Sequence, residues 1–98
     1  MKFTRHFGNL AIYAHFNQYT FDVHSYGVCI MRVDTDSRDI FVNTKYLAYS
    51  PTTTKHYCKA LAKFGINANI KELRAVIKRH IETGAVEQIQ GYNILVMR

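Results

Sequence analysis

The spacing of apolar residues changes from a period of two to a helical period at Ser50-Pro51, and this change constrains the fold more than any other feature. Before it, apolar and polar residues alternate from 10 to 24 on both sides of Asn17-Gln18, as in an antiparallel hairpin with one buried face. After it, apolar residues recur every three or four positions, which is typical of amphipathic helices. We therefore expect a sheet followed by helices.

Two more strands are expected before the change of period. Residues 26–33 are apolar at almost every position, which indicates a central strand that is covered on both faces. A polar turn at residues 34–39 separates this strand from its partner, Ile40-Phe41-Val42. The pattern thus predicts about four N-terminal strands, with residues 26–33 in the middle of the sheet.

Local signals place two helices in the second half of the chain. Ser50 is a favourable N-cap and Pro51 is pre-set for the first helical position, so one helix begins there and ends before Gly65. A second helix begins after Asn69 and ends at Gly84. The residues expected to face inward on the second helix are Ile70, Leu73, Ile77 and Ile81.

The last part of the chain completes the expected sheet. Residues 86–89 and 94–97 flank a turn and form a closing hairpin. A chain of 98 residues can build one hydrophobic core, and no linker or internal repeat divides it. The expected fold is a single α+β domain, residues 1–98, in which an antiparallel β-sheet of about four N-terminal strands plus the C-terminal hairpin packs with two consecutive amphipathic helices.

The sequence contains no membrane or secretion signal. No apolar run approaches the ~18–20 residues that cross a bilayer, and residues 1–8 lack the apolar stretch of a signal peptide. Cys29 and Cys58 lie in apolar segments, which suits reduced thiols in a reducing compartment. We expect a cytoplasmic protein that does not bind membranes.

Positive charge is concentrated in the two predicted helices. The whole chain carries +6, and residues 51–83 hold seven lysines and arginines against two glutamates, a local net charge of +5. A concentrated positive field attracts polyanions, so RNA, DNA or an acidic protein surface is the expected class of partner, and a merely solvated helix face is the alternative. The predicted basic rows are Lys55, Lys59 and Lys63 on the first helix and Lys71, Arg74 and Lys78 on the second.

The first turn of the first helix gathers groups that bind anions. Unpaired amides and the positive end of the helix dipole favour an anion there, and hydroxyl, ammonium and imidazole groups add to this tendency. The residues concerned are Thr52, Thr53, Thr54, Lys55 and His56. We expect a phosphate to bind here, with simple capping of the helix as the alternative.

No catalytic, cofactor or metal motif is present. The GxxxxGK[ST] and GxGxxG patterns are absent, and the five histidines show no HxxxH or CxxC spacing. His15 and His24 can face each other across the first hairpin, but such pairs are more often ordinary surface imidazoles. We expect no enzyme activity, cofactor or metal. The lesser alternative is a metal-independent ribonuclease that uses His56 with Tyr49 and Lys55, or His24 with Arg32.

One short segment resembles other proteins. Tyr49-Ser50-Pro51-Thr52-Thr53-Thr54-Lys55-His56 is similar to a Tyr-Ser-x-Thr-Thr-x-Lys-His stretch in small uncharacterised proteins of bacteriophages and mobile elements. The match covers eight residues. The resemblance implies a phage accessory protein in the bacterial cytoplasm. Such proteins, anti-CRISPR inhibitors among them, often act by occupying a host protein or ribonucleoprotein complex.

The leading hypothesis is a non-enzymatic binding protein that engages and inhibits a host nucleoprotein or defence complex through its cationic helix faces. The alternative is plain binding of RNA or DNA, for which the helix, helix and hairpin order after Pro51 offers a generic winged-helix comparison. A homodimer formed through a free sheet edge is a further option.

Overall fold

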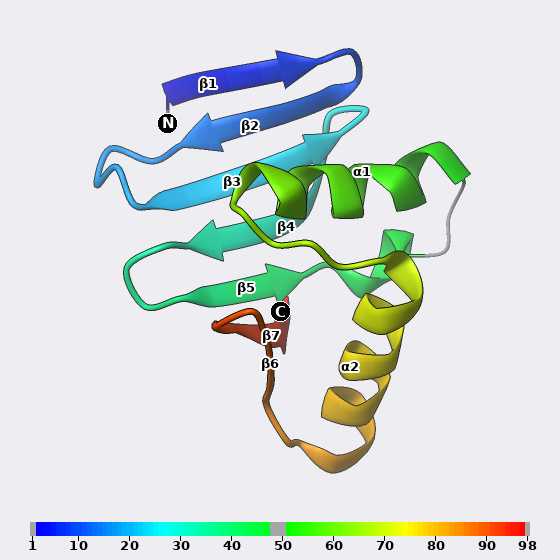
Figure 1. Cartoon of the computed structure of the whole chain (residues 1–98). Coiled ribbons are helices and arrows are strands. Elements are labelled where there is room, and N and C mark those ends of the chain that lie inside the picture. Colours follow the sequence, from blue (N-terminus) through cyan, green and yellow to red (C-terminus); the bar gives the residue numbers. More distant parts are fainter. Residues whose placement is uncertain (1, 48–50, 98) are drawn as a thin grey trace.

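The computed structural model describes the backbone of residues 2–47 and 51–97. Side chains are described for residues 8–47 and 51–97. In chain order, its elements are β1 (Lys2–Phe7), β2 (Leu10–Ala14), β3 (Thr20–Ser25), β4 (Val28–Asp34), β5 (Asp39–Val42), the 3-10 turn η1 (Thr44–Tyr46), α1 (Pro51–Lys63), α2 (Ile70–Thr83), β6 (Glu87–Ile89) and β7 (Tyr92–Val96). The strands form one sheet in the order β1-β2-β3-β4-β5-β7-β6. Both helices lie on the same side of this sheet (Figure 1).

This arrangement confirms the α+β fold and places β4 in the middle of the sheet, as the sequence predicts. Neighbouring strands are antiparallel except for β5 and β7, which run parallel. Parallel neighbours need a crossover connection, and α1, α2 and β6 supply it between β5 and β7. Strand β1 is an additional strand that the alternation pattern does not predict.

The prediction of one strand over residues 26–33, covered on both faces, is wrong on two points. Tyr26 and Gly27 form the turn between β3 and β4, with φ values of 52° and 79°. Positive φ at both central residues is the geometry of a tight hairpin turn. Along β4, Met31 is buried on the helix side, whereas its neighbour Arg32 on the other side is exposed. The helices therefore cover only one face of β4.

The hydrophobic core fills the space between the sheet and the helices. α1 packs over β2 and β3, and α2 packs over β7. Tyr57 of α1 is fully buried, and its hydroxyl donates a hydrogen bond to the backbone oxygen of Asn43 at 2.6 Å. The other large residues of this core include Leu10, Val23, Met31, Val33, Ile40 and Ile94 from the sheet and Leu61, Leu73 and Ile77 from the helices.

The helices begin and end where local signals predict. α1 begins at Pro51, and Gly65 follows its last turn with φ 79°. The Asn69 side chain accepts a hydrogen bond from the Glu72 amide at 2.8 Å and caps α2. Gly84 ends α2 in the left-handed conformation, with φ 74°. The predicted N-cap Ser50 lies outside the described residues. Within the described ranges, neither helix has both the length and the apolar character to cross a membrane.

Candidate functional site

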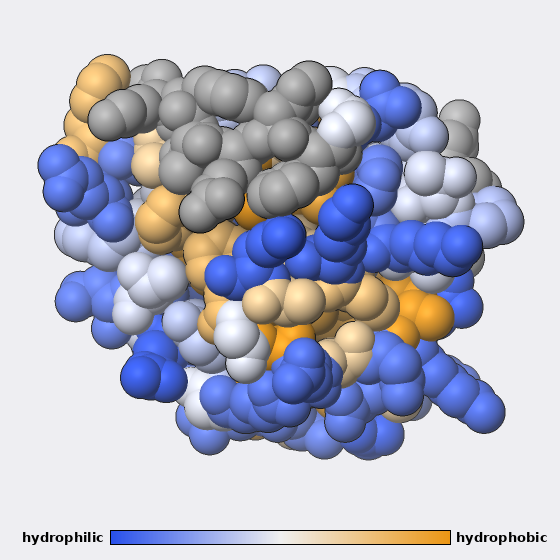
Figure 2. All heavy atoms as spheres, turned by 45° about the horizontal axis from the view of Figure 1, so that its top comes forward, coloured by the Kyte–Doolittle hydropathy of each residue, from blue (hydrophilic) through white to orange (hydrophobic). Residues whose placement is uncertain are grey.

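The six basic residues that the helical periodicity predicts are all exposed on α1 and α2. They define the cationic helix surface: Lys55, Lys59, Lys63, Lys71, Arg74 and Lys78. On α1 the lysines recur on successive turns, away from the buried stripe that contains Tyr57 and Leu61. In Figure 2, hydrophilic residues (blue) lie on both sides of a band of hydrophobic residues (orange).

Among the described residues, four of these six cations form no ion pair. Lys55, Lys71, Arg74 and Lys78 form no ion pair with a described carboxylate. Arg79 differs, because its guanidinium donates to Glu87 through Nε at 2.5 Å and Nη2 at 2.8 Å. This hydrogen bonding and the opposite charge raise the pKa of Arg79 and lower the pKa of Glu87. The protein's own carboxylates therefore neutralise Arg79 but not those four members of the cationic helix surface.

Arg74 connects α2 to the turn before α1. Its Nη2 donates a hydrogen bond to the backbone oxygen of Leu47 at 3.0 Å. The Thr54 hydroxyl approaches the same oxygen at 3.5 Å. Arg74 is nevertheless exposed, so its charge remains available to a partner while one of its donors fixes the position of α2.

The predicted anion site at the start of α1 is divided between surface and interior. Thr52 and Lys55 are exposed, and Thr54 is half-buried. Thr53 and His56 are buried, at 4% and 8% exposure. The two buried side chains do not face solvent, so the structure leaves Thr52 and Lys55 as the open groups of this first turn.

A hollow between η1 and α2 combines apolar and cationic groups. It has a volume of about 480 Å³ and is lined by Thr44, Lys45, Leu47, Arg74, Ile77, Lys78, Ile81 and Glu82. Ile81 is 61% exposed, so the prediction that it faces inward is wrong. Each step of four residues turns a helix by about 40° beyond a full circle, so Ile81 has rotated away from the stripe that Leu73 begins. Sequence reasoning missed Lys45 because it lies outside both helices.

A second group of polar side chains lies on the sheet face opposite the helices. Val23 of β3 is in the core, so Asp22 and His24 on either side of it project from the other face. In the sheet register, Asp22 pairs with Arg32 and His24 pairs with Cys29, both on β4. This part of the sheet therefore brings a carboxylate, an imidazole, a guanidinium and a thiol together.

Asp22 is the most buried member of this group, at 3% exposure. Arg32 Nε donates a hydrogen bond to Asp22 Oδ1 at 2.7 Å, and His15 Nε2 lies 3.1 Å from Oδ2. Burial alone raises the pKa of the Asp22 carboxyl, but the hydrogen bond from Arg32 and the proximity of His15 outweigh it, so the net shift is downward. The carboxyl group is thus ionised at neutral pH.

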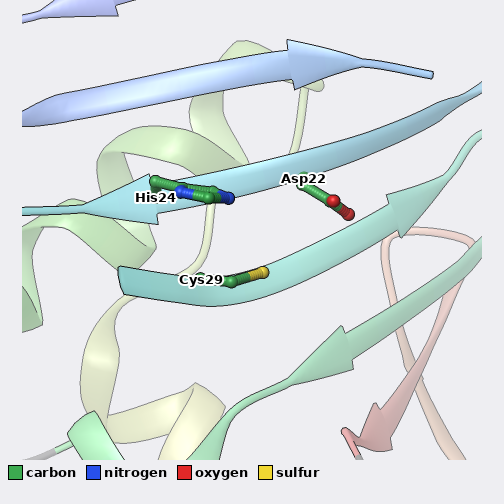
Figure 3. Close-up of side chains that lie close together, drawn as sticks. All are labelled: Asp22, His24 and Cys29. Atoms are coloured by element: carbon green, nitrogen blue, oxygen red, sulfur yellow. The ribbon is translucent and has the colours of Figure 1, made fainter. Parts of the chain in front are cut away.

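Asp22, His24 and Cys29 are close enough to act on one ligand. Their ligand atoms all lie within 4.8 Å of one another, and in Figure 3 the His24 and Cys29 side chains extend in the direction of Asp22. Burial, followed by the charge of Asp22, raises the pKa of the Cys29 thiol. We define these three residues as the open-face cluster.

The open-face cluster was not predicted from the sequence. The pair that the sequence suggests, His15 and His24, does not meet: His24 lies against the ring of Tyr13, and His15 lies beside Asp22. A turn at residues 26–27 is the signal that finds the cluster, because it places His24 opposite Cys29.

Comparisons with known proteins give no indication of function. No protein-family description matches the chain, and neither curated proteins nor solved structures include a significant match. The fold and surface define a small α+β protein with an exposed cationic helix surface and a polar cluster on the opposite face of its sheet.

Proposed function

We propose that this protein is a non-enzymatic binding protein that engages a nucleoprotein through its cationic helix surface. One observation carries the proposal: consecutive helices display exposed lysines and an arginine, and four of these six cations have no described carboxylate partner. Phosphate backbones bind such surfaces because each contact releases condensed counterions. The local charge of +5 also raises the rate of encounter with a polyanion.

The hollow beside η1 favours a nucleoprotein over bare nucleic acid. Lys45, Arg74 and Lys78 supply cations at the hollow, while Ile77 and Ile81 supply an apolar floor. The phosphates of a bare nucleic acid would pair with the cations but would leave the apolar floor exposed to water. A partner that offers both a phosphate backbone and apolar protein side chains fits both parts.

The narrower proposal is that the protein occupies and inhibits a bacterial host complex. Two features support it. The segment from Tyr49 to His56 resembles a segment of small phage proteins. The cationic helix surface suits contact with the phosphate backbone of a guide RNA or another nucleic acid. The ribonuclease alternative has less support. In the first candidate set, His56 is buried. In the second, which pairs His24 with Arg32, the guanidinium is bound to Asp22. Tyr49 of the first set lies outside the described residues.

Capture from a bacterial lysate, with and without nuclease treatment, tests this function. The wild-type chain is expected to retain one nucleoprotein, and the Lys55→Ala/Lys59→Ala/Lys63→Ala variant to lose it. Arg79→Ala is the matched control, because it removes a cation that Glu87 already neutralises. Equal capture by the wild type and the triple variant would contradict the proposal.

Salt dependence separates the proposal from plain nucleic-acid binding. For a bare duplex, the logarithm of the affinity falls with the logarithm of the salt concentration, with a slope of about 0.9 for each neutralised phosphate. Tight binding to bare RNA or DNA, with a slope that flattens in the triple variant and no protein recovered from lysate, would favour the alternative.

A further inference from the structure

We propose that the open-face cluster, Asp22, His24 and Cys29, is a zinc site. This site lies on the sheet face opposite the helices, so the proposal is independent of the cationic helix surface. It departs from the expectation, drawn from the absence of metal-binding motifs, that the chain has no metal site. The ligands come from two adjacent strands, an arrangement that no linear spacing motif describes.

The backbone holds the three donors in place before any metal binds. β3 and β4 are hydrogen-bonded neighbours in the middle of the sheet, joined by the tight turn at residues 26–27. His24 and Cys29 are directly opposite each other, and Asp22 is two residues from His24 on the same face. Because the sheet fixes these positions, binding requires adjustment of side chains only.

The distances are close to those of a zinc site. Zinc bonds of about 2.0–2.3 Å in a tetrahedral arrangement place neighbouring donor atoms roughly 3.3–3.8 Å apart. The donor atoms of the open-face cluster lie within 4.8 Å of one another. Small rotations of the side chains, which bring the donors about 1 Å closer, complete the geometry.

His15 lies beside the cluster, on the carboxylate of Asp22. Its Nε2 is buried and lies 3.1 Å from Asp22 Oδ2. Carboxylates that bind metals are themselves held by neighbouring polar groups. His15 is therefore a positioning residue that helps to fix Asp22, and the three donors are those of the open-face cluster.

The donor types select zinc over other common ions. Calcium and magnesium prefer oxygen ligands, whereas imidazole and thiolate ligands suit zinc. Arg32 donates to Asp22 Oδ1 at 2.7 Å and, more weakly, to Oδ2 at 3.5 Å, so the guanidinium orients the carboxylate. Each carboxylate oxygen has two lone pairs and can accept a hydrogen bond and bind a metal. Binding replaces the proton of the Cys29 thiol, because the thiolate is the ligand.

Differential alkylation tests the site in the unmodified chain. Cys58, which is half-buried on α1, provides an internal control. Addition of Zn²⁺ to the metal-free protein is expected to slow the alkylation of Cys29 roughly tenfold or more, and to leave Cys58 unchanged. Trypsin separates the two cysteines, so mass spectrometry follows each thiol. Equal alkylation of Cys29 with and without Zn²⁺ would overturn the proposal.

Metal titration of variants identifies the ligands. We expect about one Zn²⁺ per wild-type chain, and binding weakened at least about tenfold in His24→Ala, Asp22→Asn and Cys29→Ser but not in Cys58→Ser. Co²⁺ as a probe is expected to show a thiolate charge-transfer band that only Cys29→Ser abolishes. His15→Ala is expected to weaken binding less than the three ligand variants, because His15 contacts Asp22 and is not itself a ligand. Zinc binding that depends on His80 instead of His24 would refute the whole assignment.

Discussion

Ser25 Oγ and His56 Nδ1 lie 2.6 Å apart, and this hydrogen bond ties β3 to the second turn of α1. The Tyr26 ring lies beside the imidazole, at 5.7 Å between ring centres. Burial, and then the positive charge of Lys59, lowers the pKa of His56. The imidazole is therefore neutral at neutral pH and acts as a contact between helix and sheet.

Acidification is expected to destabilise the fold through His56. Its pKa in the folded state is below the ordinary value of 6.5, so the unfolded chain binds the proton first as the pH falls. The stabilisation is complete above about pH 6.5 and is lost as the pH falls from that value toward the folded-state pKa. Urea unfolding at about pH 7.5 and about pH 5 measures this loss.

Two comparisons isolate His56 in that experiment. His56→Gln keeps a hydrogen-bonding side chain without a titrating proton, so its stability is expected to change less across the same pH range. Asp22 has a lowered pKa, and its contribution is lost only as the pH falls below its ordinary value of 3.8, in a separate range. Equal free energies of unfolding for the wild type at both pH values would contradict the prediction.

Elements with local signals could be predicted from the sequence, and elements set by distant pairing could not. Pro51, Asn69 and Gly84 act within one helical turn of their own positions, so the helix boundaries follow from them. The parallel pairing of β5 with β7 joins strands on opposite sides of both helices in the sequence. No short-range pattern encodes that neighbour relation.

The cationic helix surface follows from a local pattern, whereas the open-face cluster depends on the pairing of two strands. The lysines of α1 repeat every four residues, so their common row is visible in the sequence. The open-face cluster depends on a turn in which Tyr26 adopts φ 52°, a conformation that bulky residues seldom take. Tyrosine favours strands, and that preference hid both the turn and the cluster.

Removal of the Tyr57 hydroxyl in Tyr57→Phe is expected to reduce the free energy of unfolding by about 1 kcal/mol, because the backbone oxygen of the half-buried Asn43 loses its donor at 2.6 Å. Tyr57→Ala is expected to cost about 3–5 kcal/mol, since it empties a fully buried position. Tyr26→Phe is the control, because Tyr26 is 54% exposed. Denaturant unfolding measures all three changes, and equal effects of Tyr57→Phe and Tyr26→Phe would refute the assigned role.

Two substitutions at positive φ are expected to act in opposite directions. Gly91→Ala places a Cβ 3.2 Å from Arg38 Nη1 at φ 89°, so it is expected to cost about 1–2 kcal/mol. Gln18 has φ 69° in an exposed loop, and Gln18→Gly removes the backbone strain of this conformation. After the entropy cost of glycine, the substitution is expected to raise the free energy of unfolding by about 0.5–1 kcal/mol. Thermal unfolding compares the two, and shifts of the same sign would contradict the backbone argument.

Ile81 is expected to contribute to partner binding and little to stability. It is 61% exposed on the hollow that Arg74 and Lys78 also line, so a partner that covers the hollow buries it. Ile81→Ser is expected to weaken nucleoprotein binding about tenfold, from the lost burial of an apolar side chain, and to leave binding to bare RNA unchanged. Val86→Ser is the matched control, because Val86 is 49% exposed and lies outside this hollow. If both substitutions weaken capture equally, general hydrophobicity and not the hollow drives the contact, and the preference for a nucleoprotein over bare nucleic acid loses its structural basis.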